Sequence, residues 1–366
     1  MGLVSFARGI PGPDLLPVDG FGEAANTAVE RDGRTILNYG PPGGYGPLRE
    51  WIAERHDVEP GRVLVTNGSL QGFNFVMRRL LGEGGRAIVE APSYDRTLLT
   101  LRALGAEVEA LPLRDDGLDV GALSESLARH GPPRVVYTIP TFQNPSGRTL
   151  SLESRHTLAR LVGEHELLVY EDDPYGGVRF EGEHLPTVFE LTHGVGIIYS
   201  SSFSKTVAPG IRVGYAVLPE ELVKPVEALA AETYISPSIF VQGALYEFVA
   251  SGGFDTALAR VRDGLRERRD AMLEALEQEL PEGSTWNRPE GGYFLWVDFP
   301  AGVDSAALLE QATEAGVTFV KGADFFLGEG GEDSARLAFS FATPDEIREG
   351  VAKLGMLARE RLAVAA

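Results

Sequence analysis

One lysine is set apart by its chemistry and by its neighbours. Lys205 is one of only four lysines among 366 residues, and it ends the run Ser-Ser-Ser-Phe-Ser-Lys at residues 200–205. Arg212 follows shortly after it. A lysine, unlike an arginine, becomes a free amine near neutral pH when burial or a neighbouring cation lowers its pKa. The pattern predicts a Schiff-base amine close to a bound phosphate.

Other groups suited to chemistry follow the short apolar runs of the chain, which are typical of buried strands. The residues that come after successive runs are Ser69 and Leu70 at a helix start, Tyr94, Asn144, Asp172 with Tyr175, and finally Lys205. Ligands of an open α/β sheet bind beyond the carboxyl ends of its strands, so we expect these groups to share one rim. The combination predicts a cofactor site.

The elements that must position these groups alternate along the chain. Strand-like runs are expected at residues 62–66, 86–91, 134–139, 167–171, 195–200 and 211–218, with amphipathic helices at 69–81, 93–104, 120–130 and 152–165. This alternation is typical of an α/β fold with a mostly parallel sheet between helices. After Pro219, longer helices and further strand-like runs indicate a smaller α+β lobe.

We therefore predict a large cofactor-binding domain at residues 31–250 and a small C-terminal domain at residues 251–366. The first 30 residues are rich in proline and glycine and show no evident element. We expect this N-terminal segment to pack across the two lobes.

Composition excludes several function classes. The net charge of −20 argues against nucleic-acid binding, which requires clustered lysine and arginine. The absence of cysteine removes disulfides, thiolate catalysis and zinc ribbons. The six histidines show no metal-ligand spacing, so no metal is assigned. With no signal-peptide pattern and no membrane-spanning apolar run, the expected location is the cytoplasm.

The predicted groups together meet the requirements of pyridoxal 5′-phosphate. Its aldehyde needs a lysine, and its ring nitrogen needs an anion to stay protonated and act as an electron sink. Its phosphate favours a helix N-terminus, hydroxyls and an arginine.

Three motifs carry a resemblance to a known family. They are Ser-x-Ser-Lys-x-x-x-Pro-Gly-x-Arg-x-Gly at residues 202–214, Asn-Pro-x-Gly at 144–147, and Asp-x-x-Tyr at 172–175. From Gly9 to Arg336 the chain resembles the fold-type I, class I/II aminotransferases, nearest the 2-aminoadipate and kynurenine aminotransferases. It is also similar to the C-terminal domains of MocR-type regulators. The resemblance implies a large domain with a mostly parallel seven-stranded sheet.

The resemblance also implies catalytic roles. Lys205 would form the Schiff base with the cofactor and then shuttle a proton, and Asp172 would pair with the ring nitrogen. Asn144 and Tyr175 would hold the phenolate oxygen of the cofactor, and Tyr94 would stack on its ring.

The remaining roles concern the cofactor phosphate and the substrate α-carboxylate. Residues that would hold the phosphate are Ser69, Leu70, Ser202, Ser204 and Arg212. Arg336 would clamp the substrate α-carboxylate, near which the Gly9 backbone and Asn144 would lie. Tyr39 resembles the tyrosine that reaches the phosphate of the neighbouring subunit, which implies a homodimer with shared sites.

The resemblance predicts a ping-pong transaminase that moves an amino group from an L-amino acid to a 2-oxo acid, with 2-oxoglutarate as the expected acceptor. A C–S lyase on the same fold and a non-enzymatic cofactor-sensing domain are the alternatives. Only eight residues precede Gly9. We therefore expect neither a DNA-binding segment nor the N-terminal helix that reads acidic side chains in some relatives. Arg8 could replace that helix, and a neutral or aromatic donor is equally open.

Less specific interpretations also exist for single residues. Lys205 could be a solvated loop residue, and Arg336 could be a surface arginine on a strand. Tyr39 and Tyr94 could be core or interface aromatics. Asp173 is expected to be a surface or capping acid.

Overall fold

The fold is built around one large twisted sheet. The computed structural model describes residues 2–82 and 84–365. Eight strands lie in the order β2-β9-β8-β7-β6-β3-β4-β5. Their bounds are β2 Val63–Thr66, β3 Arg86–Ala91, β4 Glu107–Arg114, β5 Gly117–Leu118, β6 Val135–Thr138, β7 Val169–Asp172, β8 Ile197–Ser202 and β9 Gly214–Val217.

Two strands run against the direction of the others. β9 is antiparallel to both β2 and β8, and the short β5 is antiparallel to β4, while the remaining pairs are parallel. The α/β fold and its mostly parallel sheet are therefore confirmed. The expected number of seven strands is one too low, because the two-residue β5 returns beside β4 through a tight turn at Gly117, whose φ is +98°.

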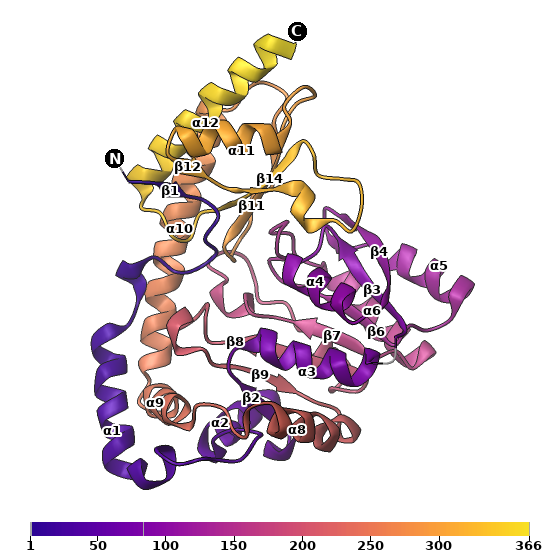
Figure 1. Cartoon of the computed structure of the whole chain (residues 1–366), viewed down its shortest axis with the longest axis vertical. Coiled ribbons are helices and arrows are strands. Elements are labelled where there is room, and N and C mark those ends of the chain that lie inside the picture. The colour runs from indigo at the N-terminus through magenta and orange to yellow at the C-terminus, as the bar shows by residue number, and fades with distance from the viewer. Residues whose placement is uncertain (1, 83, 366) are drawn as a thin grey trace.

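Helices cover both faces of the large sheet (Figure 1). They are α2 Gly46–His56, α3 Ser69–Leu81, α4 Asp95–Ala103, α5 Val120–His130, α6 Leu152–His165, α7 Val188–Leu191, α8 Glu220–Tyr234 and α9 Ile239–Ala250. The four helices predicted between the strands are present within two residues of their expected bounds. Most strands are buried on both faces, as their apolar composition requires, whereas β4 near the edge of the sheet is largely exposed.

A smaller lobe surrounds a second sheet of four strands in the order β10-β11-β14-β13, all antiparallel. The strands are β10 Thr285–Trp286, β11 Phe294–Asp298, β13 Val320–Lys321 and β14 Ser334–Ala338, and the helices are α10 Gly253–Glu279, α11 Ser305–Glu314 and α12 Pro344–Ala365. The long α10 runs beside both lobes (Figure 1). The domain boundaries after residues 30 and 250 stay predictions.

The N-terminal segment differs from the prediction. Its start forms β1 Val4–Ser5, which pairs with β12 Val317–Thr318 of the small lobe, and α1 extends over Val18–Ile36. The expectation of no element in the first 30 residues is therefore wrong. α1 depends on packing against α9, since Phe21 and Phe248 place their ring centroids 5.8 Å apart. Residues 6–12 then cross from the small lobe towards the large sheet.

Candidate active site

A cleft of about 540 Å³ lies at the carboxyl ends of the large-sheet strands, where the small lobe meets them. The predicted site residues that line it are Gly9, Ser69, Leu70, Tyr94, Asn144, Asp172, Tyr175, Ser202, Ser204, Lys205, Arg212 and Arg336. Tyr39 is the exception. It lies outside the cleft and is 77% exposed.

Lys205 follows the end of β8 and points its amine into the cleft. Its Nζ donates a hydrogen bond to the Gly9 carbonyl at 2.5 Å. Burial, then the positive charges of Arg336 and Arg212, lower the pKa of Lys205 to about 8, against the opposing effect of Asp172. The side chain is therefore not a solvated loop lysine. A useful fraction of it is a free amine at mildly alkaline pH.

Asp172, the last residue of β7, brings a carboxyl group to the floor of the cleft. Its Oδ2 accepts a hydrogen bond from Tyr137 at 2.9 Å, and its Oδ1 has no hydrogen-bond partner among the described residues. Burial, with a smaller contribution from Asp173, raises the pKa of Asp172 to about 7. A cation placed at Oδ1 would reverse this shift, because it would favour the ionised carboxylate.

Tyr137 is a site residue that the sequence did not single out. It lies within β6, where its neighbours are the apolar residues of a buried strand. Its ring packs against Tyr170 and Phe73, with centroids 5.9 and 5.4 Å away. Only the pairing of β6 with β7 reveals that its hydroxyl meets Asp172, and no local signal could have shown this.

Asp173 is a buried acid, so the expectation of a surface position is wrong. It is 7% exposed, and its oxygens accept hydrogen bonds from the Gly176 amide at 2.9 Å and from the Tyr199 hydroxyl at 3.0 Å. The bond to Gly176 confirms the expected capping role. Of these two neighbouring acids, Asp172 lines the cleft and Asp173 does not.

One end of the cleft is suited to an anion. α3 begins at Ser69 after Gly68, which has φ +90° and offers no side-chain cap, so the first amides of the helix stay available. Ser202 donates to the Ser204 hydroxyl at 3.0 Å beside this turn. Among the described residues Arg212 forms no ion pair within 4 Å. A side chain at Gly214 would collide with the Ser69 amide, so glycine is required there.

The opposite end of the cleft presents Arg336 from β14 of the small lobe. Its guanidinium donates to Asn144 Oδ1 and to the Ala7 carbonyl, both at 2.9 Å, and lies 4.4 Å from the Phe294 ring centroid. It is 8% exposed, so it is not a surface arginine. Its Nε has no partner, and no carboxylate lies within 4 Å of it in the described part of the chain.

The aromatic residues of the cleft complete its walls. Tyr175 is buried, and burial raises its pKa, with the charge of Arg336 acting in the opposite direction. Burial likewise raises the pKa of Tyr94 to about 12. Phe294 and Phe325 line the cleft beside Arg336 and were not predicted. A side chain at Gly9 would collide with the Phe294 ring, which explains the glycine.

Arg8 does not take the position considered for it. Its guanidinium lies 5.0 Å over the Phe341 ring and does not line the cleft. Arg96, on the first turn of α4, lines the cleft instead and was missed by the sequence analysis. Its neighbours Tyr94 and Asp95 are the signal that could have located it.

Comparisons with known proteins identify the family. The family model for aminotransferase class I and II matches residues 13–354. The chain belongs to this family. A 2-aminoadipate transaminase of Thermus thermophilus is 39% identical over 99% of this chain and 92% of its own length.

Two solved structures are similar throughout. An alpha-aminoadipate aminotransferase of Thermus thermophilus, complexed with N-(5′-phosphopyridoxyl)-L-leucine, has a TM-score of 0.94 at 37% identity and covers 99% of this chain and 94% of its own. A kynurenine aminotransferase of Pyrococcus horikoshii has a TM-score of 0.94 at 34% identity, covering 99% and 92%. The protein is thus a transaminase whose cofactor is pyridoxal 5′-phosphate, with the fold-type I architecture expected.

The cleft fits this cofactor by its own chemistry. It offers one amine of lowered pKa, one carboxylate oxygen and one arginine that have no hydrogen-bond partner and no ion pair, respectively, among the described residues, and a helix start without a side-chain cap. These are the three groups that the aldehyde, the ring nitrogen and the phosphate require.

No helix of the described residues is long and apolar enough to cross a membrane.

Proposed function

We propose that the cleft holds pyridoxal 5′-phosphate between its large-lobe residues and binds the amino acid against the small lobe. The amides at Ser69 and Leu70 would hold the phosphate with Ser202, Ser204 and Arg212. Asp172 would pair with the ring nitrogen through its open Oδ1, and Tyr137 would hold the other oxygen in place. Asn144 and Tyr175 would donate towards the phenolate oxygen, and Tyr94 would cover the ring.

The bound cofactor supplies an electron sink that stabilises negative charge at the substrate Cα. Lys205 has two tasks beside it. Its amine would hold the cofactor through the aldehyde and, once freed by the substrate amine, would move a proton between the substrate Cα and the cofactor. Burial, together with the charges of Arg336 and Arg212, lowers the pKa of Lys205 to about 8, so that it could both accept and return this proton.

Arg336 would bind the substrate α-carboxylate, and one observation carries this role. A guanidinium that is nine-tenths buried has an unpaired Nε and no carboxylate partner in the described structure. Burying a cation without a counter-charge is costly, so such a group favours an anionic ligand. Asn144 and Ala7 accept two of its five N–H donors and hold the guanidinium in place, which leaves further donors for a carboxylate in the cleft.

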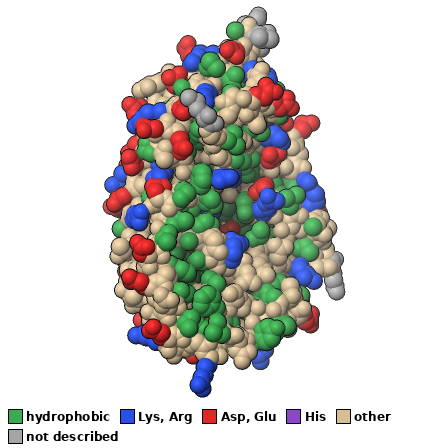
Figure 2. All heavy atoms as spheres, turned by 60° about the vertical axis from the view of Figure 1, so that its left-hand side comes forward, with side chains coloured by type: hydrophobic (Ala, Val, Ile, Leu, Met, Phe, Trp, Pro, Cys, Tyr) green, Lys and Arg blue, Asp and Glu red, His purple; other side chains and the backbone are tan. Residues whose placement is uncertain are grey.

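We further propose a homodimer with shared sites. Leu37, Tyr39 and Phe240 line a shallow depression and are 70%, 77% and 38% exposed. Figure 2 shows a broad stripe of hydrophobic side chains on one face of the molecule, below a central hollow bordered by Lys and Arg side chains. Covering such a surface with a second copy would remove apolar area from water and could bring Tyr39 to the partner's phosphate.

The reaction would run in two halves in the cytoplasm. An L-amino acid leaves its nitrogen on the cofactor and departs as a 2-oxo acid, and a second oxo acid, 2-oxoglutarate in our proposal, takes the nitrogen away. The relatives' names make 2-aminoadipate, aromatic amino acids and kynurenine the first donors to test.

The test is a donor panel with 2-oxoglutarate or pyruvate as acceptor, combined with borohydride reduction and peptide mapping. We expect amino transfer that depends on the acceptor, and label on the peptide with Lys205. Label on Lys224, Lys321 or Lys353 would refute the assignment of the amine. Release of ammonia and pyruvate without an acceptor would instead indicate a C–S lyase.

A further inference from the structure

Lys205 and Arg336, two of the cationic residues that line the cleft, are linked by a short segment of the small lobe. Tyr293 immediately precedes β11 and is fully buried. Its hydroxyl donates a hydrogen bond of 2.7 Å to the main-chain carbonyl of Lys205. Phe294, the next residue, contacts the guanidinium of Arg336 at 4.4 Å. Two consecutive residues at the start of β11 therefore contact Lys205 and Arg336, respectively.

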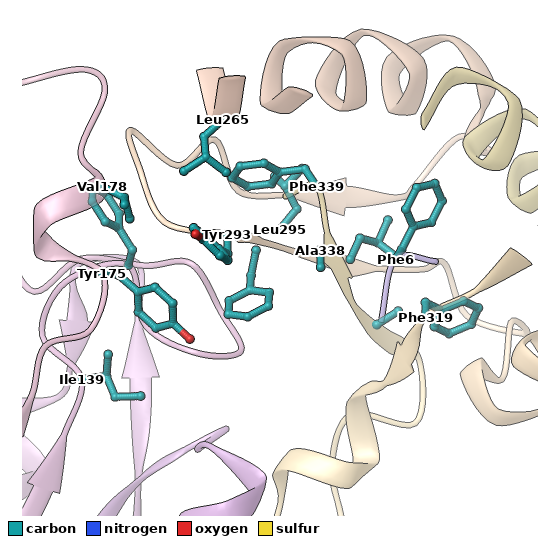
Figure 3. Close-up of a cluster of buried hydrophobic side chains, with 14 of the residues drawn as sticks. Phe6, Ile139, Tyr175, Val178, Leu265, Tyr293, Leu295, Phe319, Ala338 and Phe339 are labelled. Atoms are coloured by element: carbon teal, nitrogen blue, oxygen red, sulfur yellow. The ribbon is translucent and has the colours of Figure 1, made fainter. Parts of the chain in front are cut away.

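Tyr293 also bridges the lobes by packing. Figure 3 shows it between Tyr175 and Val178 of the large lobe and Leu295 and Phe339 of the small lobe. Its ring centroid lies 5.8 Å from that of Tyr175, and the Lys205 amine lies 5.4 Å from its ring. Tyr293 does not line the cleft itself. It can therefore act on Lys205 without touching cofactor or substrate.

The hydroxyl of Tyr293 is a specific choice for this position. A buried phenol needs a hydrogen-bond partner, and here that partner is the carbonyl of the reactive lysine rather than a carbonyl of its own lobe. The segment before it is held in place as well, because side chains at Gly291 or Gly292 would collide with Phe142 of the large lobe. One hydrogen bond from Tyr293 of the small lobe thus holds the Lys205 backbone. The packing around this segment keeps the bond in place.

We propose that Tyr293 is a positioning residue that ties the main chain of Lys205 to the small lobe and so aims its amine at the cofactor aldehyde. This inference rests on the proposed role of Lys205. In the step concerned, the amine nitrogen attacks the aldehyde carbon, a C=N bond forms, and the aldehyde oxygen leaves as water with the two amine protons. The step is sensitive to aim, because small misplacements of a reacting group cost large factors in rate.

The experiment compares two forms of the cofactor on the full chain freed of bound cofactor. Pyridoxal 5′-phosphate can bond Lys205, whereas pyridoxamine 5′-phosphate binds the same contacts without that bond. For Tyr293→Phe we expect the bond to form roughly tenfold more slowly, with the affinity for pyridoxamine 5′-phosphate unchanged. Tyr293→Met, which also removes the ring, should be at least as slow.

Tyr234→Phe is the matched control. The Tyr234 hydroxyl donates to the Pro42 carbonyl at 3.0 Å and lies outside the cleft, so this variant loses the same type of bond elsewhere. Its bond formation should equal that of the wild type, and thermal unfolding reports whether each variant folds.

Two results would overturn the inference. Tyr293→Phe could react as fast as Tyr234→Phe, or it could lose affinity for both cofactor forms together, which would indicate packing alone. Failure of the wild type to form a borohydride-stable bond at Lys205 would instead refute the proposed function.

Discussion

The two halves of the cleft are built in different ways. The large-lobe half takes its groups from the ends of neighbouring strands and from one helix start, so Asp172, Lys205 and Ser69 meet because parallel strands end at one edge. The small-lobe half joins Gly9, Phe294 and Arg336 from segments far apart in the sequence. The first half follows from the rules of the sheet, and the second exists only once the two lobes have packed.

The two halves also leave different groups unsatisfied. The large-lobe half has a carboxylate oxygen without a partner among the described residues and an amine of lowered pKa, which suit a cofactor. The small-lobe half has a buried guanidinium without a counter-ion, which suits a substrate carboxylate. We therefore expect substitutions in the first half to affect cofactor and chemistry, and those in the second to affect substrate binding.

The largest effect is expected for Lys205→Ala. This variant loses both the covalent attachment and the proton transfer at Cα, and we expect kcat to fall by roughly 10³- to 10⁴-fold. Lys205→Arg is the control for charge, because an arginine keeps the cation but cannot give up its proton. Single-turnover absorbance with a donor amino acid measures both, and activity of Lys205→Arg above one tenth of wild type would contradict the role.

Asp172→Asn should have the next largest effect. The amide is close in size, but it carries no negative charge to keep the ring nitrogen protonated, so kcat should fall by about 10²- to 10³-fold. The affinity for the cofactor should fall as well. Glu171→Gln is a matched control at the preceding residue, since Glu171 is buried and accepts its hydrogen bonds from the Val188 and Phe189 amides, away from the cleft. An equal loss in both variants would show that the charge at Asp172 is not specific.

The sequence predicts the large-lobe half better than the small-lobe half, because the former is built from strand ends and the latter from the packing of the two lobes. Residues after strands could be found because the strands are apolar runs and their ends are marked by polar residues. Tyr137 and Phe294 could not, since each lies inside such a run and its role depends on which strand or lobe it faces. Tyr293 is hidden for the same reason.

α1 was missed on different physical grounds. It contains Gly20, Gly22 and Gly33, which lower intrinsic helix propensity, and its interior is kinked at Asp32. Only Ala24, Ala28 and Ile36 are buried, so the helix depends on the tertiary contact with α9 rather than on its own sequence.

Arg336→Lys tests the small-lobe half and should leave the cofactor half intact. A lysine keeps the charge but cannot hold the Asn144 oxygen, the Ala7 carbonyl and a carboxylate in one planar fork. We expect the KM for amino acids to rise about 10- to 100-fold, with the cofactor affinity nearly unchanged. Steady-state kinetics and a cofactor titration separate the two. A parallel loss of cofactor affinity would contradict the division of the cleft into halves.

The smallest effect concerns the stability of the chain without cofactor. Burial raises the pKa values of Glu90, Glu171 and Asp172 to about 7, well above their ordinary values. The folded chain therefore binds more protons than the unfolded chain between about pH 4 and pH 7, and its stability should fall as the pH rises through that range. This stabilisation is fully present when the pH lies below the pKa values of the unfolded chain. It is lost as the pH rises through the pKa values of the folded chain.

This pH dependence distinguishes Asp172 from the other two acids. Removing one such group should lower the slope of stability against pH by a similar amount in Asp172→Asn and in Glu171→Gln. In the proposed function the bound cofactor would place a cation beside Asp172 alone, so saturation with pyridoxal 5′-phosphate should remove the Asp172 contribution and leave that of Glu171. Urea unfolding at several pH values, with and without cofactor, measures the slopes. If the cofactor left the wild-type slope unchanged, Asp172 would not face the ring nitrogen, and the large-lobe half would need another anion for that task.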